Sequence, residues 1–325
     1  MDQSNTMQNL TKNKRPARSG FTLIELMIVI FIISILASLS AYVLAGAVTD
    51  AKIAKTKAQV TKLNNLLMER WESYETRQLQ LNVPVGTTPA QMALIRLYAL
   101  RQMMRIEMPD RFEDITKLPN PNPPLNPIAP SPAPISSLQR FYQLRIAGFT
   151  NTTNESAECL YLIISSIEDE FGSAIDNFGT SDIGDTDNDG FLEFVDGWGN
   201  PIGFIRWPAG YRSAVQKVIM QDGIVPLYDP DPNDPFRADP RFRQANPPFK
   251  PYLLAPLIFS AGPDERHDIK LAISSPAFVT ANGYYAYDDP YVHENVPQPT
   301  NFAPLGTPTG SGYIDNIDNH IGVIQ

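Results

Sequence analysis

The sequence predicts an α+β fold in which a long N-terminal α-helix, with a membrane half and an amphipathic half, packs on an antiparallel β-sheet head with large loops. No proline lies between Pro16 and Pro84, so one continuous helix is possible there. Beyond residue 190, short apolar runs are bounded by glycine and proline, as is typical of strands. Segments dense in proline interrupt these runs and predict the loops.

The first half of the expected helix is apolar on all sides. From Phe21 to Val48 the only charged side chain is Glu25. About 20 apolar residues span the hydrocarbon core of a bilayer, so residues 21–48 are long enough to cross a membrane. The preceding leader, residues 1–20, is basic, which predicts that it stays in the cytoplasm while the C-terminal part crosses.

Glu25 is anomalous, because a charged carboxylate in a bilayer costs about 2.5–3.5 kcal/mol and usually has a partner. Cleavage after Gly20 would leave Phe21 with a positive α-amine one helical turn before Glu25. If identical helices stack side by side with a small axial offset, each Glu25 can pair with the amine of its neighbour. The alternative is a single-pass anchor whose interfacial glutamate snorkels to water.

The junction Gly20-Phe-Thr-Leu-Ile-Glu25, after a basic leader and before an apolar helix, resembles the type IV pilin and type II secretion pseudopilin family. The resemblance implies cleavage after Gly20 by a prepilin peptidase, N-methylation of Phe21, and a role for Glu25 in subunit registration. It implies as partners other pilin or pseudopilin subunits and an inner-membrane assembly platform. It also implies that the chain is anchored in a bacterial inner membrane with its head in the periplasm or outside the cell.

The second half of the helix, residues 49–82, is amphipathic. Its apolar residues recur at steps of three, four and seven; they are Ile53, Val60, Leu63, Leu67, Trp71 and Tyr74. We therefore expect one helix from about Thr22 to about Leu81, with this stripe packed under a globular head formed by residues 83–325. A short coiled-coil seam is the alternative.

Further helical patterns follow at Ala90–Met108, Ser136–Gly148 and Glu155–Phe171. Between the first two, Leu118–Pro134 contains eight prolines and predicts an extended polyproline-like excursion. The head should continue with short strands and two more large loops. The expected strands are Phe194–Val195, Pro201–Trp207, Tyr252–Ala255 and Leu257–Phe259, and the expected loops are Asp222–Pro248 and Pro276–Thr309.

An acidic segment, Asp185–Asp196, has the spacing of a calcium loop. Such loops place oxygen ligands at positions 1, 3 and 5, glycine at 6, a backbone carbonyl at 7, an often water-mediated group at 9 and a carboxylate at 12. The residues at those positions are Asp185, Asp187, Asp189, Gly190, Phe191, Glu193 and Asp196. We expect a structural Ca²⁺ site here, although an aspartate at position 12 has a shorter arm than the usual glutamate; a solvated acidic turn is the alternative.

The next segment, Asp196-Gly-Trp-Gly-Asn-Pro201, resembles the Asp-x-Trp-Gly-Asn-Pro turn of major pseudopilin heads, and Trp198 can anchor such a turn in the core. Phe259–Asp264 and Asp315–His320 resemble closing segments of the same family. Their spacing does not assign metal ligands.

Composition excludes several classes of function. The formal net charge of −9 argues against a nucleic-acid partner. The single cysteine, Cys159, excludes an intrachain disulfide and predicts a buried small apolar residue, with an intermolecular bridge as the alternative. Three histidines occur without a His-Glu-x-x-His helix, a Gly-x-Ser-x-Gly elbow or a phosphate-binding glycine loop, so we do not expect an enzyme.

These features together predict a structural subunit of a type II secretion pseudopilus, processed after Gly20 and assembled through its N-terminal helix. A type IV pilus or competence-filament pilin is the first alternative. A monomeric, membrane-tethered calcium-binding receptor is the second.

Overall fold

The structure is a computed structural model, in which the chain falls into two compact units that meet between Thr49 and Asp50. The first unit holds the first half of helix α1, and the second holds the rest of α1 and the head. The described residues are 20–79, 81, 83, 85–116, 137–148, 151–169, 172–216, 219–221, 224–227, 229–243, 250–272, 289–291 and 304–320.

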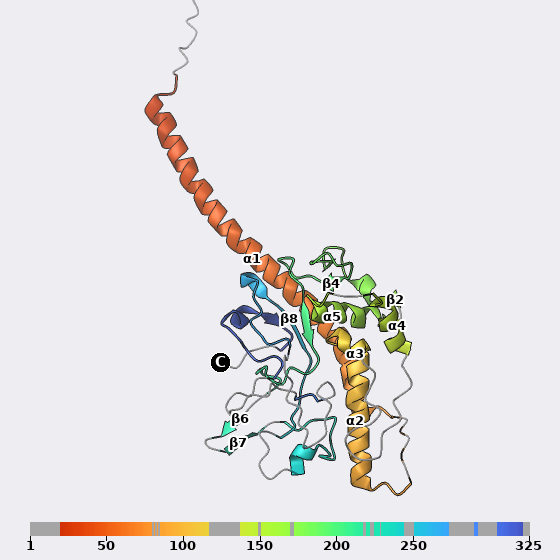
Figure 1. Ribbon diagram of the computed structural model, residues 1–325. Coiled ribbons are helices and arrows are strands. Elements are labelled where there is room, and N and C mark those ends of the chain that lie inside the picture. Colours follow the sequence, from red (N-terminus) through yellow and green to blue (C-terminus); the bar gives the residue numbers. More distant parts are fainter. Residues whose placement is uncertain are drawn as a thin grey trace, which may run out of the picture. The chain divides into compact units, whose positions relative to one another are not determined.

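Helix α1 runs without a break over Leu23–Thr76, which confirms the predicted long helix (Figure 1). It ends five residues before the predicted Leu81. Arg77, just past the end, instead forms a two-bond ion pair with Glu107, at 2.7 and 2.9 Å. In the second unit the buried face of α1 consists of Thr56, Gln59, Val60, Leu63, Leu67, Trp71 and Tyr74, so the predicted apolar stripe is confirmed, with Ile53 half-buried at its edge.

Four shorter helices follow: α2 (Pro89–Glu107), α3 (Phe112–Thr116), α4 (Ser137–Arg145) and α5 (Glu155–Ser165). At the start of α2, Thr88 and Gln91 form a reciprocal capping box ahead of a proline in the first turn, which explains why the helix begins there. The prediction for α5 was too long, because the chain turns back after Ser165. Strands β1 (Glu168–Asp169) and β2 (Gly172–Ser173) pair there, and Gly172 has φ of 132°, which only glycine adopts readily.

The strands of the head are short and antiparallel, as predicted. Among the described residues, β5 (Gly203–Ile205), β8 (Leu257–Ser260) and β9 (Ile317–Asp318) form a three-stranded sheet in the order β5-β8-β9. Two pairs complete the described strands: β3 (Ile183–Gly184) with β4 (Glu193–Phe194), and β6 (Ile219–Gln221) with β7 (Ile224–Leu227).

Two predictions in the C-terminal half were wrong. Tyr252–Ala255 is not a strand; Tyr252 makes a single bridge to Pro230. The expected loop Asp222–Pro248 contains strand β7 and a 3₁₀ turn, Pro240–Arg243. The expected excursion Leu118–Pro134 and most of the expected loop Pro276–Thr309 lie outside the described residues.

The main core of the head forms around the buried stripe of α1. Side chains from α2, α5 and strands β4, β5, β8 and β9 pack on that stripe; they include Leu100, Met104, Leu160, Ile163, Ile164, Phe194, Phe204, Ile258 and Ile317. A smaller apolar cluster joins α3, α4 and α5, and Cys159 lies fully buried within it, which confirms its predicted apolar role.

A buried ionic cluster joins α2 and α3 to the end of β5. Arg206 donates to Asp114 at 2.8 Å and to the Met108 carbonyl at 2.7 Å, while its backbone N–H donates to Asp110 at 3.1 Å. Burial would raise the pKa of Asp110, but the charges of Arg206 and Arg111 outweigh it and lower that pKa to about 2. These buried carboxylates therefore have guanidinium partners and serve to hold the helices to the sheet.

The glycine-rich turn after β4 docks on the second half of α1. Gln59 donates to the Val195 carbonyl at 3.1 Å, and the Gly197 N–H donates to Thr56 at 2.9 Å. The Lys52 ammonium lies 5.8 Å from the centre of the half-buried Trp198 ring. Trp198 also packs against the main core, as the turn motif predicts.

Gly197 has no room for a side chain, because a Cβ there would lie 2.7 Å from the Lys52 carbonyl oxygen. We predict that Gly197→Ala destabilises the head by about 1–3 kcal/mol, since helix backbone must move to admit the methyl group. Denaturant unfolding of the detergent-solubilised full chain measures this. Gly179→Ala is the matched control: its Cβ would meet nothing nearer than 3.4 Å, so a change within about 0.5 kcal/mol is expected. Equal losses in both variants would contradict the close approach.

The buried His320 holds the segment Asp315–His320 against the sheet. Ser213 Oγ donates to His320 Nδ1 at 2.9 Å, and His320 Nε2 donates to the Pro256 carbonyl at 3.1 Å, so the neutral ring satisfies both bonds. Burial lowers the pKa of His320 to about 4. Two residues earlier, burial raises the pKa of Asp318 to about 6.

The lowered pKa of His320 means that its contribution to stability is complete above pH 6.5 and is lost as pH falls towards 4. The loss amounts to about 3 kcal/mol. The raised pKa of Asp318 has the opposite effect on stability, because its contribution is lost as pH rises from 3.8 to about 6. Comparing the wild type with a His320 variant separates the two contributions, since both proteins keep Asp318. We predict that His320→Gln is less stable than wild type at pH 8 but that this difference shrinks steadily between pH 6.5 and 4. Unfolding free energies of both proteins at each pH test this; a constant difference would contradict it.

Candidate functional site

The start of α1 is built around Glu25. The Glu25 carboxylate accepts from both the N–H and the hydroxyl of Thr22 at 2.8 Å, and the Glu25 N–H donates to the Thr22 hydroxyl at 3.3 Å. This reciprocal arrangement is a capping box, which satisfies N–H groups that a helix start otherwise leaves unpaired. Sequence reasoning missed this role, although Thr22-x-x-Glu25 is its signature. Gly20 and Phe21 precede the first helical turn and are exposed.

The apolar residues after Glu25 are exposed throughout, and Phe21 itself is 83% exposed. Large apolar side chains of this segment, from Leu23 to Val48, include Ile24, Leu26, Met27, Phe31, Ile32, Leu36, Leu39 and Val43. Helix α1 is long and apolar enough to cross a membrane by length and composition. A continuous exposed apolar surface of this size is unstable in water, so it requires lipid or neighbouring helices.

The acidic segment after β3 folds into a turn stabilised by its own carboxylates. Asp185 accepts from the N–H groups of Asp189, at 3.1 Å, and of Gly190, at 3.0 Å. Gly190 has φ of 95°, as the sharp turn requires of the sixth position. Asp189 accepts from the Phe191 N–H at 2.9 Å, and the Phe191 ring packs against Phe112.

The structure brings Asp187 and Asp189 together with a residue that sequence reasoning missed, Glu158 of α5. One carboxylate oxygen from each of the three lies within 4.8 Å of the others. Burial and the charges of Asp189, Glu193 and Asp187 raise the pKa of Glu158 to about 9. The available signal in the sequence was a carboxylate inside an apolar run, since Ala157, Cys159 and Leu160 beside it are all buried.

The structure places the last two predicted ligands in other hydrogen-bond networks. Glu193 accepts from the Thr186 N–H at 3.1 Å and from the Asn154 amide at 3.3 Å, so it links the loop to the start of α5. Asp196 accepts from the N–H groups of Trp198 and Asn200 at 2.8 and 3.0 Å, and from the Ser260 hydroxyl at 2.7 Å. Asp196 therefore organises the glycine-rich turn.

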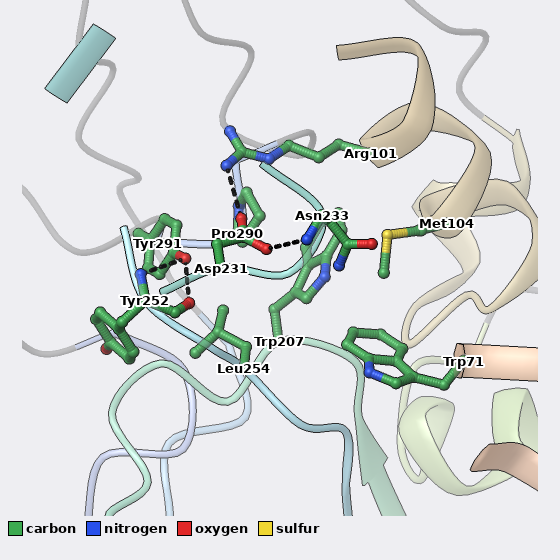
Figure 2. A pocket seen from close by; sticks show the side chains of 10 residues that line it. All are labelled: Trp71, Arg101, Met104, Trp207, Asp231, Asn233, Tyr252, Leu254, Pro290 and Tyr291. Atoms are coloured by element: carbon green, nitrogen blue, oxygen red, sulfur yellow. Dashed lines mark hydrogen bonds and ion pairs between the residues drawn. The ribbon is translucent and has the colours of Figure 1, made fainter. Parts of the chain in front are cut away.

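A separate pocket lies between α1, α2 and the loop after β7 (Figure 2). Arg101 on its wall bonds Asp239 at 2.9 Å and Asp231 at 3.4 Å, and Tyr252 donates its N–H to the Tyr291 hydroxyl at 2.9 Å. The cavity measures about 10 Å³, which is room for one water molecule at most. Its charged groups hold the loop to α2.

The comparison with known families decides the nature of the N-terminal segment. Residues 15–41 match the family model of the prokaryotic N-terminal methylation motif. The searches of curated proteins and of solved structures returned no match.

The methylation motif covers Gly20, Phe21 and Glu25 and supports the predicted relation to type IV pilin-like proteins. It implies processing by a prepilin peptidase and pilin-type assembly, and it points to a structural subunit and away from an enzyme. Together with the single apolar helix at the N-terminus, it fits single-pass membrane anchoring. Residues 42–325 lie beyond the matched region.

Proposed function

We propose that the chain is a structural subunit of a type II secretion pseudopilus, processed after Gly20 and assembled through the first half of α1. The single observation that carries this is the methylation motif at residues 15–41, placed at the start of a helix whose apolar side chains are exposed. Before assembly the helix rests in the bacterial inner membrane, with the leader in the cytoplasm and the head in the periplasm. Other subunits then cover the helix, so the same apolar surface contacts lipid before assembly and neighbouring helices afterwards.

Assembly follows from the charge on Glu25. After cleavage, the Phe21 amine of one subunit and the Glu25 carboxylate of its neighbour neutralise each other in a place poor in water. Within a single chain, the capping box already occupies Glu25 with Thr22. A carboxylate can accept more bonds than Thr22 offers, so the same group can hold the helix start and receive the neighbouring amine.

Mass spectrometry of the mature protein tests processing. We predict an N-terminus at Phe21 carrying one added methyl group, and a protein that retains residues 1–20 would contradict the proposal.

Substitution of Glu25 tests assembly and separates its two roles. Glu25→Gln keeps the capping box, because glutamine serves equally at that position, but removes the charge. We predict normal cleavage and membrane insertion with at least a tenfold loss of filament incorporation, measured by shearing and immunoblotting. Glu25→Ala, which removes both roles, should lose assembly to a similar degree. Wild-type assembly of Glu25→Gln would refute the charge pairing.

The turn Asp196–Pro201 and the segment Phe259–Asp264 favour the secretion pseudopilus over a surface pilus, because they resemble pseudopilin heads. Deletion of the gene should stop protein secretion and leave twitching, adhesion and DNA uptake intact. The opposite pattern would favour a type IV pilus or competence-filament pilin. Loss of none of these activities would favour a membrane-tethered receptor.

A further inference from the structure

The acidic loop meets a buried carboxylate that has no partner. Glu158 is 1% exposed, and neither of its side-chain oxygens has a hydrogen-bond partner in the described part of the chain. Asp187 Oδ1 is also buried and unpartnered there. Removing a carboxylate from water costs several kcal/mol unless a positive group or hydrogen bonds replace the water. The buried oxygens of Glu158 and Asp187 thus require a cation or a proton.

Asn151 holds the two loop carboxylates of this group together. Its amide donates to Oδ2 of Asp187, at 2.8 Å, and to Oδ2 of Asp189, at 3.3 Å. These bonds leave Asp187 Oδ1 without a hydrogen-bond partner in the described part of the chain. One carboxylate oxygen from each of the three residues lies within 4.8 Å of the others, so a single cation can contact all three. Three carboxylates suit Ca²⁺, which takes about six to eight oxygen ligands in a flexible geometry, better than Mg²⁺, which keeps several waters and is usually bound through one or two carboxylates.

We propose that Glu158, Asp187 and Asp189 bind a divalent cation, and that Ca²⁺ fits best. The site combines Glu158 of α5 with Asp187 and Asp189 of the loop. The sequence pattern instead predicted that every ligand comes from Asp185–Asp196. Asp185 and Asp196 shape the turns on either side, and Glu193 bonds Thr186 and Asn154.

Such a cation would fasten the acidic loop to the helix that supports the sheet. Ser156, on the same helix, both donates to the Phe204 carbonyl at 2.6 Å and accepts from the Phe204 N–H at 2.7 Å. Asn154, directly before the helix, bonds Thr186 in the loop at 2.8 Å. Glu158 lies one turn further along α5. Binding there therefore stiffens the junction of loop, helix and β5, and it does so whether or not the subunit assembles.

Thermal unfolding of the detergent-solubilised full chain in CaCl₂ and in EGTA tests the site. At a CaCl₂ concentration a hundredfold above Kd, we expect Tm to rise by about 5–10 °C over the EGTA value. MgCl₂ at the same concentration should raise Tm less. Equal Tm values in CaCl₂ and EGTA would overturn the site, and an equal response to Mg²⁺ would overturn the preference for Ca²⁺.

Variants identify the ligands. Glu158→Gln should abolish the calcium shift, because an amide cannot supply the negative oxygen that the cation needs, and should leave Tm in EGTA close to that of the wild type. Asp187→Asn, at a half-buried position, should also abolish the shift. Asp196→Asn is the control; it should lower Tm in both buffers but keep the shift. If Asp196→Asn loses the shift and Glu158→Gln keeps it, the ligand set proposed here is wrong. Far-ultraviolet circular dichroism verifies that each variant is folded.

Discussion

The head depends on the burial of one stripe of α1. From Val60 to Tyr74 this helix supplies the side chains around which α2, α5 and the sheet pack. The strands are only two to four residues long, so the sheet alone buries little apolar surface. Their stability comes from packing on the helix, and the turn around Gly197 adds polar bonds to the same helix. A head of this kind cannot be separated from the second half of α1.

The two halves of α1 place their apolar side chains in opposite environments. In its first half no side chain between Phe21 and Val48 other than Glu25 is charged, and the apolar side chains are exposed. In its second half charged residues such as Lys57 and Glu69 alternate with the buried stripe. Neither half needs a break in the backbone, because helical hydrogen bonds satisfy the main chain equally in lipid and in protein. A single helix thus carries an exposed apolar surface and a buried core stripe one after the other.

Sequence patterns predicted what depends on local periodicity and on motifs. The long helix, α2, the buried stripe and the N-terminal motif all follow from spacings within a few residues. The predictions failed where the structure depends on an unusual backbone conformation or on a contact between residues far apart in the sequence. After Ser165 the chain pairs β1 with β2, and Gly172 has φ of 132° there. Tyr252 lies outside the strands, where its hydroxyl donates to the Ala209 carbonyl and its N–H donates to the Tyr291 hydroxyl. Glu158 was missed for the same reason, since only the fold places it beside a loop about 30 residues away.

The bonds between Thr22 and Glu25 hold the start of α1 both in a free subunit in the membrane and in the proposed filament. In a single subunit the N–H and the hydroxyl of Thr22 both donate to one oxygen of Glu25 and replace part of its hydration. Under the proposed assembly, a neighbour's amine would meet a carboxylate that Thr22 already holds in one orientation, so little side-chain entropy would be lost at that step. If the proposed pairing is broken again, the bonds to Thr22 still hold the helix start. A subunit would therefore enter or leave the proposed filament without refolding the first turn of α1.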